Sequence, residues 1–291
     1  MIVYLLFRFA ILVIKIIPFF LLYICSDGIA FILHRVIGYR KKVILTNLRN
    51  AFPDQSPSAI QSILKKTYKN LSDISLEGIK GMSCSQEELI KRYKFLNPEV
   101  VYDIFEKGKS AIGLVAHYNN WEWGAFATAP QIKGEVVGVS KSVRNPYMDR
   151  FIKKNRARFD ARIILMNETA RALIENRGTP TLFVLIADQS PSNARTAHWL
   201  TFLHQDTACL IGPDKIARRT NYPAIYFDVR RVKRGFYEIT ASFLHSNPSE
   251  LKPGGLTDLY MKKLEKVIID NPENWLWSHR RWKKRRFKNL E

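Results

Sequence analysis

Cysteine and acidic side chains are scarce in this sequence of 291 residues. The three cysteines, Cys25, Cys84 and Cys209, are far apart and show no metal-ligand spacing. This pattern argues against a disulfide framework and favours reduced thiols in a cytosol-facing protein. Only 26 acidic residues accompany 46 lysines and arginines, which gives a formal net charge of +20. A chain of this charge is expected to bind phosphates, an anionic membrane surface or an acidic protein.

The sequence also lacks a Gly/Ser-rich linker and an internal repeat. Its hydrophobic content of 46% and aromatic content of 12% are typical of a folded protein. The length suits a single domain with an appendage. We expect an N-terminal membrane anchor at residues 1–37, followed by a folded domain at residues 38–291.

The anchor segment runs from Ile2 to Ile37 and is mostly apolar, interrupted by Arg8 and Lys15. No small-residue cleavage site follows it, which argues against a signal peptide. The segment is long enough to span a membrane, but the charge of Lys15 near the middle of the span would be costly to bury. A shallow or tilted anchor, kinked at Pro18, accommodates both charges at the headgroups. The alternative is an apolar hairpin that packs on the soluble domain.

A basic cluster begins at the end of the anchor and continues directly after it. It predicts that the remainder of the chain lies on the cytoplasmic, positively charged side of the membrane. The cluster consists of Arg35, Arg40, Lys41, Lys42 and Arg49.

The rest of the sequence alternates apolar strand patterns with helical periodicity. This alternation predicts an α/β fold with a mixed, largely parallel sheet flanked by helices, preceded by the hydrophobic membrane-anchor helix. Strands are expected at residues 111–117, 135–140, 181–187, 224–230 and 236–243. Helices are expected at residues 59–80, 86–92, 97–108, 120–129, 145–159, 167–176, 213–220 and 257–271.

Two polar segments stand at the carboxyl ends of apolar strands, where open α/β sheets bind ligands. His117 ends one strand, and Glu122 follows five positions later, so its carboxylate could turn back to the imidazole and orient it as a base. Asp188 and Gln189 end another strand and could converge with His117 on one cleft. The alternatives are a satisfied polar pair at a strand–helix junction for His117 and Glu122, and a cap for Asp188.

A basic helix is expected after Asn145. Arg144 and Arg156 could bind a phosphate or stabilise developing negative charge, because guanidinium geometry suits oxyanions. The alternative for either residue is a solvated surface cation, as is expected for some of the basic residues of this region. The other basic residues are Arg150, Lys153, Lys154, Arg158 and Arg162.

The C-terminal segment at residues 275–286 interleaves tryptophans with a dense run of cations. One interpretation is nucleic-acid binding by stacking and phosphate contacts. The favoured interpretation is docking at a membrane interface, with tryptophan at the headgroup level and cations on lipid phosphates. His279 is assigned a structural role.

Taken in order, these segments resemble the lipid A lauroyl/myristoyl acyltransferases of Gram-negative bacteria, a branch of the lysophospholipid acyltransferase superfamily. The resemblance extends over most of the chain. It depends on residues 38–43, 47–53, 117–122 (the His-x4-Glu form of the family's motif), 144–146, 187–189, 201–208 and 271–282.

The resemblance implies an enzyme at the cytoplasmic face of the bacterial inner membrane. It would transfer a fatty acyl group from acyl-carrier protein, or from acyl-CoA, to a hydroxyl of a lipid A precursor. His117 oriented by Glu122 would be the base, Arg156 and Arg144 would bind substrate or the oxyanion, and Asp188 would hold the site in place. Direct transfer is expected, without a covalent intermediate, a metal or a cofactor.

Three alternatives stay open. A related acyltransferase could act on a glycerophospholipid, an ornithine lipid or another glycolipid. The charge alone would also suit a membrane-tethered nucleic-acid-binding protein, but that class leaves His117 and Glu122 without a role, so no nucleic-acid partner is expected. An inactive membrane adaptor of the same fold is disfavoured for the same reason.

Overall fold

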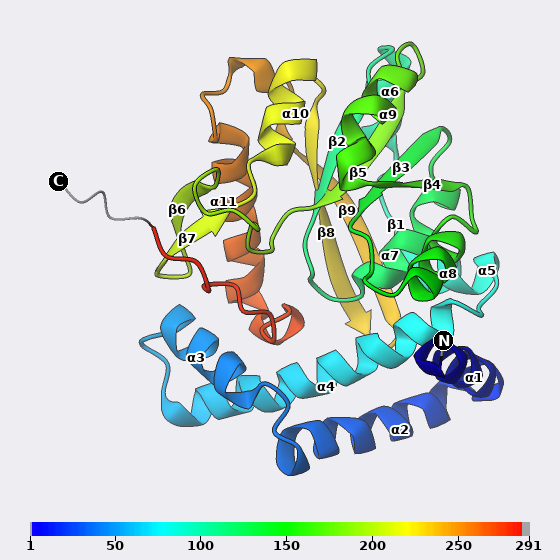
Figure 1. Ribbon diagram of the computed structural model, residues 1–291, viewed down its shortest axis with the longest axis vertical. Coiled ribbons are helices and arrows are strands. Elements are labelled where there is room, and N and C mark those ends of the chain that lie inside the picture. Colours follow the sequence, from blue (N-terminus) through cyan, green and yellow to red (C-terminus); the bar gives the residue numbers. More distant parts are fainter. Residues whose placement is uncertain (1, 287–291) are drawn as a thin grey trace.

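The computed structural model describes residues 2–286 and has a seven-stranded sheet at its centre (Figure 1). The strands are β1 (Tyr93–Phe95), β2 (Ala111–Val115), β3 (Glu135–Ser140), β4 (Ala161–Leu165), β5 (Thr181–Ile186), β8 (Ala224–Lys233) and β9 (Phe236–His245). Their order is β1-β9-β8-β2-β5-β3-β4, and every neighbouring pair is parallel except the antiparallel pair β8–β9. The predicted mixed, largely parallel sheet is confirmed.

The central strands β2 and β5 are buried because both faces of the sheet are covered by helices. One buried cluster joins the sheet to α3, α4, α9, α10 and α11, and a second joins it to α5, α6 and α7. The helices are α3 (Lys41–Ala51), α4 (Pro57–Gly81), α5 (Gln86–Arg92), α6 (Glu99–Glu106), α7 (Trp121–Ala127), α8 (Pro146–Arg156), α9 (Thr169–Glu175), α10 (Gly212–Thr220) and α11 (Gly255–Asp270).

The N-terminal segment forms two helices, α1 (Ile2–Ile16) and α2 (Phe19–Phe31), separated at Pro18; α2 continues into the π-helical turn η1 (Ile32–Val36). Figure 1 shows α2 running along α4, on the side away from the sheet. Polar contacts fasten the two helices together: Ser26 Oγ donates to Asp73 Oδ1 at 2.6 Å. The expected kink at Pro18 is therefore a break between two helices.

The outer side of α1 and α2 remains apolar. The stretch Phe19–Val36 is long and apolar enough to cross a membrane, by length and composition alone. The segment thus packs on α4 with one side, as in the hairpin alternative, and keeps a surface fit for a membrane on the other. The predicted boundary between residues 37 and 38 stays a prediction. The exposed apolar residues are Ile2, Val3, Leu5, Leu6, Phe9, Leu12, Val13, Ile16, Phe20, Leu21, Ile24, Ile29, Phe31, Ile32 and Val36.

Several short strands had no clear sequence signal. β1 and β4 lie at the two edges of the sheet, and β4 alternates buried and exposed positions around Arg162. A separate antiparallel hairpin is formed by β6 (His198–Phe202) and β7 (Gln205–Cys209). Strands of three to five residues are too short to show a clear alternation of apolar and polar residues. Their formation depends mainly on the segments with which they pair.

The C-terminal aromatic run lies in the core, which corrects the expectation of docking at a membrane interface. Trp275 and Trp277 are 3% and 0% exposed and stack edge-to-face at 4.8 Å, and Arg281 is 1% exposed. Trp282 packs on Phe202. The tryptophans are buried because the segment folds back over the strand ends and α11, and this fold-back is invisible in the local pattern.

Candidate active site

The site begins with His117 and Asp188, which follow the neighbouring parallel strands β2 and β5. Val115 pairs with Ile186, so the residues just beyond both strands lie side by side at the carboxyl edge of the sheet. His117 Nδ1 lies 2.7 Å from Asp188 Oδ1. The predicted convergence of these two side chains is confirmed.

Asp188 is 2% exposed and accepts from three donors. Besides the imidazole, its Oδ2 accepts from the backbone N–H of His117 at 3.0 Å and from Trp275 Nε1 at 2.9 Å. Burial alone would raise the pKa of Asp188, but the nearby His117 and these donors hold it below the ordinary value. The carboxylate is therefore charged at neutral pH, and its orientation is fixed from three directions.

The charge of Asp188 acts on His117. Burial lowers the pKa of His117, but the Asp188 carboxylate and, to a smaller extent, Glu122 raise it, and the net pKa lies above its ordinary value of 6.5. With Nδ1 donating to Asp188, Nε2 keeps its lone pair and accepts from the Gln189 amide at 3.2 Å. The ring also meets Trp121 edge-on at 5.1 Å. The neutral imidazole is thus arranged as a proton acceptor.

Glu122 lies elsewhere than expected. It stands in the first turn of α7, whose N-terminus is capped by Asn120 Oδ1 accepting from Trp123 N at 2.9 Å. Its carboxylate is held by Arg156 from the end of α8, with Nη2 at 2.6 Å and Nε at 3.3 Å. Among residues 2–286, the carboxylate hydrogen-bonded to the imidazole is that of Asp188, because the strand pairing brings it closer than one helical turn brings Glu122.

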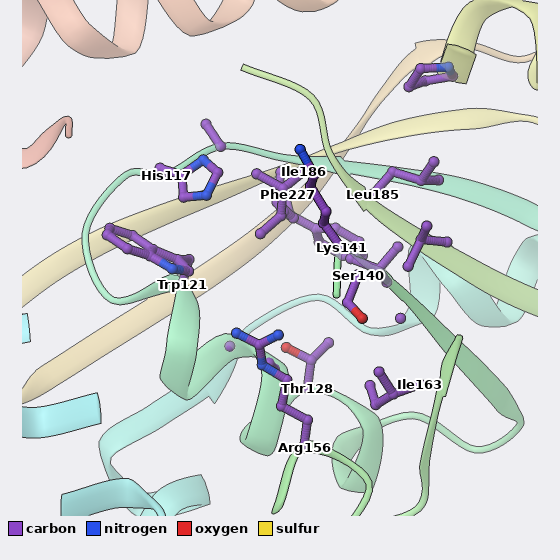
Figure 2. A pocket seen from close by; sticks show the side chains of 18 of the residues that line it. His117, Trp121, Thr128, Ser140, Lys141, Arg156, Ile163, Leu185, Ile186 and Phe227 are labelled. Atoms are coloured by element: carbon purple, nitrogen blue, oxygen red, sulfur yellow. The ribbon is translucent and has the colours of Figure 1, made fainter. Parts of the chain in front are cut away.

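A cavity of about 530 Å³ opens beside these residues, between α7 and the strands. Figure 2 shows His117 and Trp121 on the left of the view, Leu185 and Ile163 on the right, and Arg156 below. The lining is mostly apolar away from the His117 end, which is the composition of a site for a lipid chain. Its apolar lining includes Tyr93, Ala129, Val136, Val139, Ala161, Ile163, Val184, Leu185, Phe227, Val229 and Ile239.

The cavity extends along the sheet away from the carboxyl edge. Ala161 is the first residue of β4 and Val136 the second of β3, and both line it. Val136 lies four positions before Ser140, which is at the edge, so the depth along β3 is roughly 13 Å. Gly138 lies between them, where a Cβ would approach Ile163 Cδ1 to 2.9 Å. The glycine keeps this part of the cavity open.

Cationic residues differ in their access to the cavity. Arg156 and Lys141 line it, whereas Arg144 is exposed in the β3–α8 connection and is not part of the lining. The sequence reasoning missed Lys141, although it directly follows the apolar strand β3, at the same edge as His117 and Asp188. The rule that polar residues after parallel strands converge would have found it.

His279, in the C-terminal segment, contacts the loop that follows Asp188 and Gln189. Its Nε2 accepts from the backbone N–H of Ser190 at 3.4 Å. Burial lowers the pKa of His279 to about 4, so this ring is neutral at neutral pH. Among residues 2–286, no three His, Cys, Asp or Glu side chains cluster so that they could hold a metal ion. That the reaction needs no cofactor stays a prediction.

A proton acceptor at the mouth of a deep apolar cavity, on a largely parallel sheet, suits an enzyme that acts on a lipid. The family model described as bacterial lipid A biosynthesis acyltransferase matches residues 1–284, and the chain belongs to this family. It is also similar to the lipid A biosynthesis lauroyltransferase of Escherichia coli (strain K12). The two are 22% identical over 272 residues, which cover 92% of this chain and 87% of that protein. The predicted family is confirmed.

Proposed function

We propose that this protein transfers a fatty acyl group from the thioester of acyl-carrier protein to a hydroxyl of a lipid A precursor. The observation that carries the proposal is the His117 imidazole, polarised by Asp188, at the mouth of the 530 Å³ cavity. Family membership supports the acyl transfer and the acceptor class. The positive charge of the chain suits both a phosphorylated glycolipid and an acidic carrier protein.

In the proposed reaction the acceptor hydroxyl replaces the Gln189 amide at His117 Nε2. The imidazole takes the hydroxyl proton as the oxygen attacks the thioester carbonyl. The tetrahedral intermediate then collapses, the carbon–sulfur bond breaks, and the leaving thiolate takes the proton from His117. Asp188 holds the imidazole in the tautomer that can accept the proton and stabilises the imidazolium that forms. The hydroxyl attacks directly, so no side chain needs to be acylated.

Glu122 and Arg156 form a second pair in this proposal. Glu122 fixes the guanidinium at 2.6 Å, and both side chains line the cavity next to the imidazole. Arg156 would then stabilise the oxyanion or a phosphate of the acceptor, and Lys141 would add a second cation at the same mouth. Arg144 lies outside the lining, so we assign it to the protein surface.

The acyl chain would occupy the apolar part of the cavity. Each methylene transferred from water to such a lining contributes about 0.8 kcal/mol to the binding free energy. Burial of a long chain would therefore hold the thioester in place beside His117. The apolar outer surface of α1 and α2 would place the enzyme on the membrane that contains the acceptor, and we propose the cytoplasmic face of the inner membrane as its location.

The proposal is tested with His117→Ala in the full chain. Purified enzyme in detergent or vesicles is given acyl-carrier-protein thioester and a lipid A precursor, and mass spectrometry of lipid A is compared in strains with and without the gene. We expect His117→Ala to abolish transfer and the matched control His245→Ala, which is outside the cavity lining, to retain it. Transfer at the wild-type rate by His117→Ala refutes the assignment.

The same assay addresses the alternative acceptors. A panel with a glycerophospholipid and an ornithine lipid precursor is expected to show no transfer. If lipid A is unchanged in the deletion strain and one of these lipids loses an acyl chain, the proposed acceptor is wrong. The assignment of His117 as the base can still stand.

A further inference from the structure

The C-terminal segment, which does not belong to the sheet, is hydrogen-bonded to the loop that carries His117. Asn119 N donates to Asn274 O at 2.9 Å, and Leu276 N donates to His117 O at 3.1 Å. Tyr118 and Trp275 form an antiparallel bridge between these bonds. The backbone of residues 274–276 therefore fixes the position of residues 117–119.

The side chain of Trp275 extends this contact to the acid. Its indole N–H donates to Asp188 Oδ2 at 2.9 Å, while Asp188 Oδ1 bonds the imidazole of His117. Both Trp275 and Asp188 are buried, at 3% and 2% exposure, so water does not compete for this bond. The indole is itself held edge-on by Phe202 and Trp282.

We propose that Trp275 is a positioning residue of the active site. Its indole N–H would hold the Asp188 carboxylate in the orientation in which Oδ1 meets His117 Nδ1. The inference rests on the proposed function, because it assigns Trp275 to the base of that reaction. A buried tryptophan usually finds some partner for its N–H, so the competing explanation is a core residue whose polar atom is merely satisfied.

The chain offers a matched control in Trp277. It lies two residues further on, is 0% exposed, and donates its indole N–H to the backbone carbonyl of Pro272 instead of to the active site. Trp275→Phe and Trp277→Phe thus remove the same atoms from the same aromatic cluster. They differ in whether the lost N–H bonded Asp188.

The first measurement is acyl transfer by the full-length enzyme over a range of pH. A lost hydrogen bond to a buried charged group is expected to lower kcat by about 10- to 100-fold in Trp275→Phe, with KM for the acceptor unchanged. Without the indole N–H the Asp188 carboxylate can turn out of line with His117 Nδ1, so it raises the pKa of His117 less. The acidic limb of the kcat/KM profile should therefore move to lower pH in Trp275→Phe and stay in place in Trp277→Phe.

The second measurement needs no substrate. The pKa of His117 is followed by NMR of histidine-labelled protein in detergent micelles, with His117→Ala used to assign the signal. A downward shift in Trp275→Phe alone supports the proposal. A His117 pKa that is unchanged or raised in Trp275→Phe, or a kcat no lower than that of Trp277→Phe, overturns it.

A variant that preserves the shape of the side chain keeps the proposal testable if Trp275→Phe fails to fold. If Trp275→Phe does not fold, 3-benzothienylalanine at position 275 keeps the bicyclic shape and replaces only the N–H by sulfur. The same two measurements then decide. If the wild-type enzyme shows no His117-dependent transfer, the proposed function fails, and the NMR titration still tests the contact from Trp275 to Asp188.

Discussion

Exchanging Asp188 for Asn tests which of two carboxylates, Asp188 or Glu122, assists His117. Two N–H donors, from the His117 backbone and from Trp275, point at Asp188 Oδ2, and the imidazole lies at Oδ1. An Asn side chain satisfies the two donors only with its carbonyl oxygen, and its NH₂ group then faces His117 Nδ1. That orientation forces the proton onto Nε2, where the reaction needs a lone pair.

The magnitude follows from the cost of the other orientation. Turning the amide leaves two buried N–H groups facing an NH₂ donor, at roughly 1–3 kcal/mol each, so the productive tautomer is disfavoured by about 2–6 kcal/mol. We expect kcat of Asp188→Asn to fall by about 30-fold to 10⁴-fold. Glu122→Gln removes the charge from a pair with Arg156 that is only partly buried, so we expect about fivefold or less.

The assay is steady-state acyl transfer by purified enzyme, with the pH profile recorded for each variant. The base must be neutral, so wild-type activity rises with pH through the raised pKa of His117, at a pH above 6.5. Without the Asp188 charge, burial dominates, and the acidic limb should move to lower pH. Trp275→Phe is expected to move the limb in the same direction, because it keeps the Asp188 charge but loses its orientation.

Asp258→Asn is the matched control, because Asp258 makes the same kind of contact, 2.7 Å from His198 Nε2, and neither residue lines the cavity. It should leave kcat and the pH profile unchanged. The reasoning is refuted if Glu122→Gln costs as much kcat as Asp188→Asn, or if the limb of Asp188→Asn stays at its wild-type pH. Glu122 would then be the carboxylate that orients the base during turnover.

Two further predictions concern the acyl cavity and the membrane surface. Ala161→Leu fills the cavity at the remote end of β4 and should shift the chain-length preference, measured with a series of acyl thioesters, towards shorter chains; an unchanged preference means that the chain lies elsewhere. Val143 is 41% exposed and lies near the contact of Tyr4 in α1 with Tyr147 in α8, so we expect it to lie on the side of the protein that meets the membrane. With the protein bound to anionic vesicles, a spin label at Val143 should be accessible to oxygen dissolved in the bilayer, whereas a label at Ile174 should remain in water. Equal oxygen accessibility of the two labels contradicts this placement.

The sequence predicted the long elements well because their signals are local. α5 and β3 have the expected bounds, and α4 ends at the expected Gly81. Ser56 caps α4 through its hydroxyl, which accepts from Ala59 N. Hydrophobic periodicity and caps depend on residues within a few positions of one another, so a single sequence contains them. The edge strand β4 was missed because most of its stability comes from its pairing with β3.

The sequence predicted which residues lie at the site better than it predicted which of them are hydrogen-bonded to each other. His117 and Asp188 were expected to meet because each ends a parallel strand, and they do. Glu122 was expected to orient the imidazole from sequence proximity, whereas its carboxylate bonds Arg156. One helical turn places a side chain only roughly, while strand register fixes neighbouring positions closely.

The sequence by itself determined the family, the alternation of strands and helices, the apolar N-terminal segment and the strand-end position of His117. Only the tertiary structure decided which carboxylate bonds the imidazole and where the tryptophans of the C-terminal segment lie. The contacts of Asp188 with His117 and Trp275 join residues 71 and 87 positions apart. Periodicity reports which side of an element is buried, and only the pairing of distant segments determines what that side touches.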